Sequence, residues 1–134
     1  MLHKSKVLIS IVDDDKAARE SLQDLVRSLG YSIISFSAAK EFLASALLHH
    51  TTCLISDVQM PGMSGLELQA KLIAMEFYIP AIFITGQPNE AVRVRALEAG
   101  AIGFLTKPID QNDLLACLAR AFIPTPVELL AAHA

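Results

Sequence analysis

The chain has 134 residues with 53% hydrophobic content and a mean hydropathy of +0.45, which indicates one folded domain and argues against intrinsic disorder. The formal net charge of −3 has a local origin: three consecutive acids occupy positions 13–15, and the other eleven acids balance the eleven basic side chains. The longest uncharged stretch, residues 42–56, is too short and too polar to cross a membrane, and no basic stripe predicts contact with nucleic acid.

Five short apolar runs follow one another along the chain, at residues 7–12, 32–36, 53–56, 81–85 and 101–105. Each run is continuously apolar instead of alternating, which is typical of strands whose two faces are both covered by helices. The segments between successive runs are long enough for the crossover helices that parallel strands require. The pattern predicts an α/β fold with a mainly parallel sheet, and it leaves the order of the strands open.

The segments between these runs carry helix signals. Residues 16–29 have apolar side chains at helical spacing and are followed by Gly30, a typical helix stop. Three polar side chains are placed to cap the later helices: Ser37, Ser64 and Asn89. Glu67 completes capping-box spacing with Ser64, and the helix after Ser37 is expected to continue through Leu47.

The last helix has a predicted apolar face made of four side chains: Leu114, Leu115, Leu118 and Phe122. A Pro-Thr-Pro sequence at 124–126 ends it, so we expect a folded domain over residues 1–123 and a linker or tail over residues 124–134. A short helix in this tail that packs on a partner or on a second copy is the alternative.

Both cysteines, Cys53 and Cys117, lie inside apolar runs. This placement suits small buried side chains in a reducing compartment better than a disulfide framework. We therefore expect a cytoplasmic protein. The apolar run at residues 7–12 has only six residues and ends in the three acids, so it is not expected to be the core of a signal peptide.

Polar side chains stand at four of the five strand exits. Asp13 and Asp14 follow the first strand, Asp57 follows the third, Thr85 ends the fourth, and Lys107 follows the fifth. The carboxyl ends of parallel strands share one edge of an open sheet, which is where such folds place their ligands. The sequence therefore predicts that these five side chains meet at one edge.

The chemistry of this set favours a phosphate and a hard cation. Carboxylates with no His or Cys nearby are the ligands that Mg²⁺ prefers, together with water and a phosphate oxygen. Lys107 and the hydroxyl of Thr85 can each contact a phosphate oxygen. An aspartate held beside Mg²⁺ can itself act as the nucleophile and form an aspartyl phosphate.

Each of these residues also has a purely structural interpretation. Asp15 is placed to cap a helix and to compensate its dipole, and the same role is open to Asp13 and Asp14. Asp57 can form an Asx turn before the Pro-Gly pair at 61–62, and Lys107 can be an ordinary solvated lysine. The functional interpretation depends on the five side chains occurring together.

Four sequence segments resemble the receiver domains of bacterial two-component response regulators: IVDDD (11–15), ISDVQMPGMSGLEL (55–68), IFITG (82–86) and AGAIGFLTKP (99–108). The similarity extends from about residue 7 to about residue 122 and is greatest to the FixJ-like subgroup. It implies a CheY-like, flavodoxin-like (βα)5 fold: a doubly wound five-stranded parallel sheet of order 2-1-3-4-5, with the receiver domain over residues 1–123.

The resemblance also implies a role for individual residues. Asp57 matches the phosphoacceptor and is also one of the implied Mg²⁺ ligands. Asp13 and Asp14 match the acidic pair that binds Mg²⁺, with Asp14 as the direct ligand and Asp13 acting partly through water. The backbone carbonyl of Gln59 matches the remaining protein ligand. Two further matches concern pairs of residues: Lys107 with a cis bond to Pro108, and the switch pair Thr85 and Phe104.

The function implied is a phosphorylation-dependent switch and not an enzyme that turns over a substrate. A sensor histidine kinase would phosphorylate Asp57, and residues 89–122 would form the responding surface and a possible phosphorylation-promoted dimer. FixJ-like proteins usually carry a C-terminal DNA-binding domain, which this sequence lacks, so the chain would be an excised or a stand-alone receiver that contacts neither nucleic acid nor membrane itself.

Two other functions are compatible with parts of this pattern. A Mg²⁺-dependent phosphatase would use the same aspartyl phosphate, but such enzymes usually carry a second acid two residues after the nucleophile, where this chain has Gln59. A degenerate interaction module is disfavoured because no position of the site has been lost.

Overall fold

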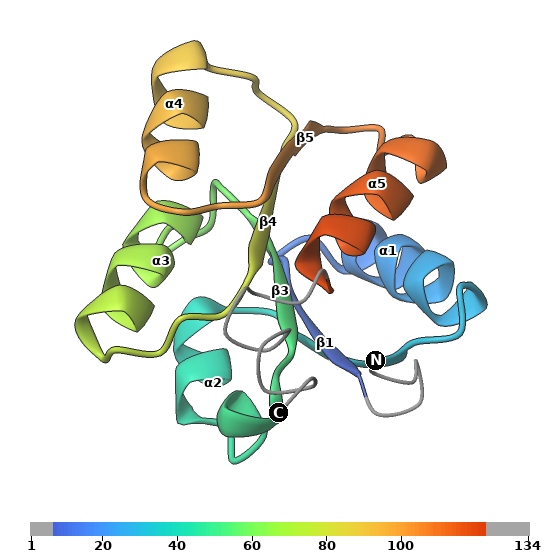
Figure 1. The fold of residues 1–134 in the computed structure, drawn as a ribbon, viewed down its shortest axis with the longest axis horizontal. Helices are drawn as coiled ribbons and strands as arrows, with labels where there is room; N and C mark the ends of the chain where they lie inside the picture. The colour runs from blue at the N-terminus through green and yellow to red at the C-terminus, as the bar shows by residue number, and fades with distance from the viewer. Residues whose placement is uncertain (1–6, 123–134) are drawn as a thin grey trace, which may run out of the picture.

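The computed structural model describes residues 7–122, in which five strands alternate with helices (Figure 1). The strands are β1 (Leu8–Val12), β2 (Ser32–Phe36), β3 (Cys53–Asp57), β4 (Ala81–Thr85) and β5 (Gly103–Thr106). The α-helices are α1 (Lys16–Ser28), α2 (Ala39–Ala44), α3 (Gly65–Ala74), α4 (Glu90–Glu98) and α5 (Gln111–Ala121). A 3₁₀ turn, η2 (Leu48–His50), lies between α2 and β3.

The five strands form one parallel sheet of order β2-β1-β3-β4-β5, which confirms the predicted topology. α1 and α5 cover one face of this sheet, and α2, α3 and α4 cover the other (Figure 1). Successive strand residues alternate between the two layers: Ile82 and Ile84 pack with α1 and α5, whereas Ala81 and Phe83 pack on the opposite face. Continuous apolar runs are needed because both faces are buried.

Local capping signals place most of the helix starts correctly. The amide of Val92 donates to the side chain of Asn89 at 3.1 Å. Ser64 and Glu67 form the expected reciprocal capping box, with both hydrogen bonds at 3.1 Å. Gly30 follows α1 with a φ of 95°, a left-handed conformation that glycine adopts without strain.

The prediction for the segment after Ser37 was wrong. Ala38, not Ser37, is the N-cap of α2, and the Ser37 hydroxyl instead donates to the carboxylate of Glu41. α2 ends at Ala44 because Ser45 is extended and its hydroxyl accepts a hydrogen bond from the amide of Leu47 at 3.0 Å. The helix therefore does not reach Leu47, which lies exposed.

Smaller corrections concern element ends and one side chain. β3 includes Asp57 as its last residue, and β5 runs over Gly103–Thr106 instead of 101–105. Leu115 is 36% exposed, so it is not part of the buried face of α5. Cys53 and Cys117 are free and buried as predicted, and burial raises the pKa of the Cys53 thiol to about 12.

Within residues 7–122, no helix has both the length and the apolar character needed to span a bilayer. The predicted tail at 124–134 lies outside the residues that the structure describes.

Candidate functional site at the carboxyl edge of the sheet

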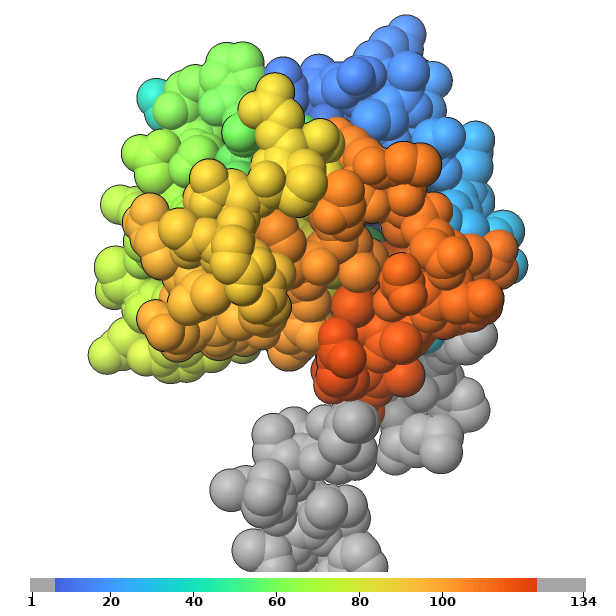
Figure 2. Space-filling model, turned by 90° about the horizontal axis from the view of Figure 1, so that it is seen from above, coloured from blue at the N-terminus to red at the C-terminus, as the bar shows by residue number. Residues whose placement is uncertain are grey.

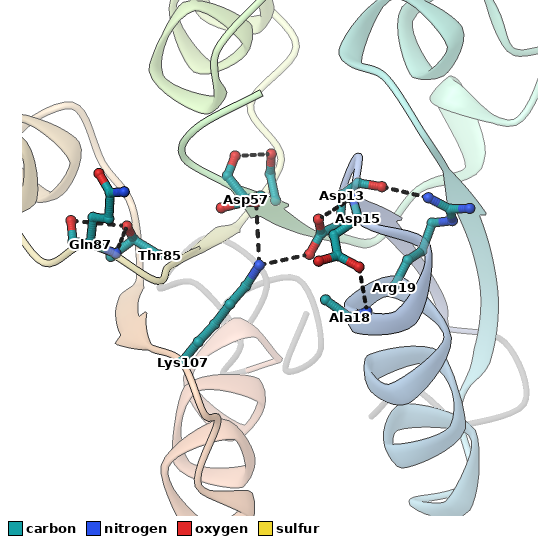
Figure 3. A network of polar contacts seen from close by, with 9 residues as sticks. Asp13, Asp15, Ala18, Arg19, Asp57, Thr85, Gln87 and Lys107 are labelled. Carbon is teal, nitrogen blue, oxygen red and sulfur yellow. Dashed lines mark hydrogen bonds and ion pairs between the residues drawn. The ribbon is translucent and has the colours of Figure 1, made fainter. Parts of the chain in front are cut away.

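Four of the five predicted polar side chains meet at the carboxyl edge of the sheet: Asp13, Asp14, Asp57 and Lys107. Figure 3 shows Asp13, Asp57 and Lys107 in contact there, with Thr85 to one side. Asp13 comes directly after β1, Asp57 ends β3, and Lys107 comes directly after β5. Because β1, β3, β4 and β5 are neighbours in the sheet, side chains that are far apart in sequence come into contact here. The strand order therefore creates the site.

Three carboxylates form a compact cluster at this edge. Asp13, Asp14 and Asp57 each contribute an oxygen atom, and these oxygens all lie within 4.8 Å of one another. Asp13 and Asp57 are buried, whereas Asp14 is exposed to solvent. The donor set consists only of oxygen atoms, with one side open to water, and it therefore fits a hard divalent cation such as Mg²⁺.

Lys107 bridges the two buried carboxylates. Its Nζ lies 3.1 Å from Oδ2 of Asp13 and 3.3 Å from Oδ2 of Asp57. The backbone of Lys107 is fixed as well, because its amide donates to the carbonyl of Thr85 at 2.8 Å and its peptide bond to Pro108 is cis, as expected. The positive charge of the Lys107 ammonium thus partly neutralises the negative charge of the acidic cluster.

The environment opposes ionisation of Asp57. Burial, followed by the nearby charge of Asp13, raises the pKa of the Asp57 carboxyl above its ordinary value. The charge and hydrogen bond of Lys107, and a hydrogen bond from the backbone of Gln59, act in the opposite direction without cancelling the effect. A cation bound between these carboxylates would remove the repulsion and favour the ionised, nucleophilic form.

Lys107 responds in the complementary way. Burial alone lowers the pKa of its ammonium, but the hydrogen bond and charge of Asp13, together with those of Asp57, raise it above its ordinary value. Lys107 is therefore fully protonated at neutral pH and keeps its charge available for an anion.

Thr85 is buried at the end of β4, and its hydroxyl is bonded to Gln87 instead of to the acidic cluster. The hydroxyl donates to the Gln87 carbonyl at 3.1 Å and accepts from the Gln87 amide at 3.0 Å. Figure 3 shows this pair to one side of the contact between Asp57 and Lys107. The structure thus places Thr85 at the predicted edge with its hydroxyl turned to its own loop.

Two other predicted residues lie close by but outside the carboxylate cluster. Phe104, in β5, is half-buried and packs with the core layer of α2, α3 and α4. With residues at the start of α4 it lines a hollow of about 170 Å³. Gln59 is exposed in the loop after β3, and the role of its carbonyl as a metal ligand stays a prediction.

Two features of the site were not found from the sequence. A Cβ atom at Gly65 would lie 2.4 Å from the Asp57 carbonyl oxygen, so only glycine lets α3 start this close to Asp57. Arg19 of α1 donates from Nη1 to the carbonyl oxygen of Asp13 at 2.8 Å. Neither contact could be recognised from the spacing of residues in the sequence, because the partners meet only after the chain has folded.

Asp15, in contrast, is the predicted helix cap: its side chain accepts from the Ala18 amide at 3.2 Å.

Comparison with known proteins gives one family. The family model for the response regulator receiver domain matches residues 9–119. Nodulation protein W of Bradyrhizobium diazoefficiens is 41% identical over 111 residues, covering 83% of this chain and 49% of the relative. Response regulator protein TmoT of Ectopseudomonas mendocina is 43% identical over 125 residues, covering 93% of this chain and 57% of the relative. The chain thus spans about half the length of these relatives.

Solved structures give the same result. The crystal structure of FixJ-N superposes with a TM-score of 0.79 at 30% identity, covering 93% of this chain and 99% of that one. The response regulator StyR also superposes with a TM-score of 0.79, at 38% identity, covering 96% of this chain and 64% of that one.

Proposed function

Because the chain belongs to the response regulator receiver domain family, we propose that it acts as a phosphorylation-dependent switch in which Asp57 accepts a phosphoryl group from a sensor histidine kinase. The observation that carries this proposal is the meeting of Asp57 with Asp13 and Lys107 at one edge of the sheet, with Lys107 3.3 Å from Asp57. The two buried carboxylates and the ammonium come from three different strand ends.

In the proposed reaction, a carboxylate oxygen of Asp57 attacks the phosphorus atom of a phosphohistidine. A new P–O bond forms, the P–N bond breaks, and its electron pair leaves with the imidazole nitrogen, which takes up a proton. Lys107 stabilises negative charge on the phosphoryl oxygens. Asp13, Asp14, Asp57 and the Gln59 carbonyl would hold Mg²⁺, which would neutralise charge on the carboxylates and the phosphoryl group when bound.

Phosphorylation would change the contacts of the residues around Asp57. The phosphoryl group brings almost two negative charges and new acceptor oxygens, so it competes with the carboxylates for Lys107. The Thr85 hydroxyl would leave Gln87 and donate to the phosphoryl group, and the ring of Phe104 would move inward. Moving such a surface from mostly inactive to mostly active requires roughly 3–5 kcal/mol of differential interaction, which a few charge-assisted hydrogen bonds can supply.

The proposed readout is the surface formed by residues 89–122, through a homodimer or an output domain outside this chain. The regulator names of the relatives support a role in transcription control, with any DNA contact made by another domain. A cytoplasmic location is part of the proposal, since the two buried thiols would stay reduced there.

The test is phosphorylation by a small donor. The protein is incubated with Mg²⁺ and acetyl phosphate or phosphoramidate, and its intact mass is recorded. We expect an increase of about 80 Da, the mass of one phosphoryl group, that disappears in Asp57→Asn and without Mg²⁺. Asp15→Asn is the matched control and should still be phosphorylated, because Asp15 only caps α1.

Two outcomes would contradict the proposal. If neither donor yields an adduct on the wild-type protein, Asp57 is not a phosphoacceptor. Catalytic release of phosphate from many different phosphoesters would instead support a phosphatase.

A further inference from the structure

Arg19 occupies an unusual place in α1. It lies in the first turns of the helix, whose first turn contains no acidic residue. The N-terminus of a helix carries a partial positive charge, so a cation is electrostatically unfavourable there. The guanidinium of Arg19 donates from Nη1 to the carbonyl oxygen of Asp13 at 2.8 Å, on the side of Asp13 that faces away from Asp57 and Lys107 (Figure 3). Arg19 therefore makes a specific hydrogen bond from a position in the helix where its positive charge is unfavourable.

The oxygen that Arg19 binds belongs to the peptide group between Asp13 and Asp14. The remaining polar groups of Asp13 are engaged as well: its amide donates to the Phe36 carbonyl at 3.1 Å, Oδ1 accepts from the Asp15 amide at 2.9 Å, and Oδ2 accepts from Lys107. Asp13 is therefore held on every side, and Arg19 fixes the peptide plane that leads out of it.

Asp14 depends on this peptide plane. Its carboxylate is exposed and has no hydrogen bond or ion pair with any other residue in the described range 7–122, yet one of its oxygens lies within 4.8 Å of oxygens from Asp13 and Asp57. Because no side-chain contact orients Asp14, its backbone must do so. Rotation of the 13–14 peptide would swing the Asp14 carboxylate away from the cluster.

We propose that Arg19 is a positioning residue for metal binding, which acts by holding the Asp13–Asp14 peptide so that both carboxylates face Asp57. The inference rests on the proposed Mg²⁺ site. Partners that orient metal ligands typically change metal affinity by about 10- to 100-fold when they are removed. Arg19 does not touch the cation or the phosphoryl group.

Electrostatics and positioning predict effects of opposite sign for the loss of Arg19. Removing a positive charge close to a cation site strengthens cation binding because it removes Coulomb repulsion. Losing the hydrogen bond to the Asp13 carbonyl weakens cation binding because Asp14 is no longer oriented. Lys16, in the same first turn, is exposed, and its nearest acidic partner is Glu20 at 4.0 Å. Lys16→Met therefore removes the same charge without removing the contact.

The experiment is a calorimetric titration of the metal-free protein with Mg²⁺. We expect the Kd of Arg19→Met to rise about tenfold, that of Lys16→Met to stay unchanged or fall, and that of Arg19→Lys to lie between wild type and Arg19→Met. In metal-free NMR spectra the Asp14 amide should shift in Arg19→Met and not in Lys16→Met. If Arg19→Met does not fold, Arg19→Lys is compared with wild type: it keeps the positive charge but not the guanidinium, so weaker Mg²⁺ binding would still indicate positioning.

Three results would overturn the inference. If wild type binds Mg²⁺ and Arg19→Met binds it equally well or more tightly, positioning by Arg19 is wrong while the proposed function stands. If Lys16→Met weakens Mg²⁺ binding as much as Arg19→Met does, the loss comes from a general disturbance of the start of α1 and not from the contact of Arg19 with Asp13. Failure of the wild-type protein to bind Mg²⁺ would overturn both this inference and the proposed metal site.

Discussion

α4 and α5 lie on either side of β5 in the chain, and they are attached to the sheet very differently. α5 buries Leu114, Cys117 and Leu118 in the core layer that it shares with α1. α4 buries only Ala96, and all of its other side chains are exposed or half-buried. Figure 2 shows both helices on one face of the molecule, α4 in gold and α5 in red-orange.

Ala96, the one fully buried residue of α4, lies near the C-terminal end of the helix, whereas Val92 and Leu97 are half-buried against the core. Gln69 of α3 is buried and donates from Nε2 to the Ala96 carbonyl at 3.1 Å, and the Ala101 amide donates to the same oxygen at 3.0 Å. The opposite end of α4 carries an exposed ion pair between Glu90 and Arg93. That end follows the loop that holds the Thr85 hydroxyl.

This difference separates a helix that stabilises the fold from one that can move at low cost. Few buried apolar contacts mean a low free energy of local opening. We infer that α5 is a fixed support for β5 and that α4 is the element of the 89–122 surface that responds most readily to changes at Thr85. Substitutions at the contacts of the two helices test this contrast.

Leu118→Ala should destabilise the protein by about 3 kcal/mol, because it leaves a cavity under a fully buried side chain of α5. The free energy of unfolding is measured by urea denaturation followed by circular dichroism. Leu115→Ala, in the same helix at a position that is 36% exposed, should change it by less than about 1 kcal/mol. Equal losses in the two variants would show that α5 is not anchored as described.

Gly103→Ala should destabilise the protein by about 2 kcal/mol through overpacking between β5 and α5. A Cβ atom at this position would lie 2.4 Å from Sγ of Cys117. The loss should be clearly smaller in a Cys117→Ala background, because the sulfur atom is gone. Gly86→Ala is the control, since a Cβ there meets nothing within 4 Å. If the Cys117→Ala background gives no relief, the tight contact between β5 and α5 is not the cause.

Gln69→Met should have the smallest effect on global stability, about 1 kcal/mol, because it removes one hydrogen bond and keeps a side chain of similar size. Its local effect should be larger: amide hydrogen exchange should accelerate across α4 and stay unchanged in α5. Gln111→Met, at an exposed position, should alter neither helix. Unchanged exchange in α4 would mean that Gln69 does not anchor it.

Much of the fold could be predicted from local signals. Continuous apolar runs located the strands, and polar caps such as Ser64 and Asn89 located helix starts, because capping depends on residues within one turn. The same reasoning failed at Ser37, where the hydroxyl has two acceptable partners and Glu41 is preferred to the backbone. Cap geometry there depends on how the chain leaves β2, and the sequence window does not contain that information.

The candidate site divides in a similar way. The types of its residues, and their place at strand exits, were visible in the sequence at Asp13, Asp57 and Lys107. The resemblance to receiver domains supplied the strand order that periodicity left open. The contacts of Arg19 with the backbone of Asp13 and of Gly65 with the backbone of Asp57 could not be predicted. Nothing in the neighbouring sequence distinguishes these two residues from other arginines and glycines of the chain.

The local acidic excess at residues 13–15 illustrates what each level determines. By itself, the sequence determined that three of the acids are consecutive and that the rest of the chain is balanced in charge. Only the tertiary structure separated their roles: Asp15 caps α1, Asp13 is buried against Lys107, and Asp14 stays open to solvent beside Asp57. The reason is physical. The free energy of a charge depends on burial and on its neighbours, and here the parallel sheet supplies those neighbours from strands that are distant in the sequence.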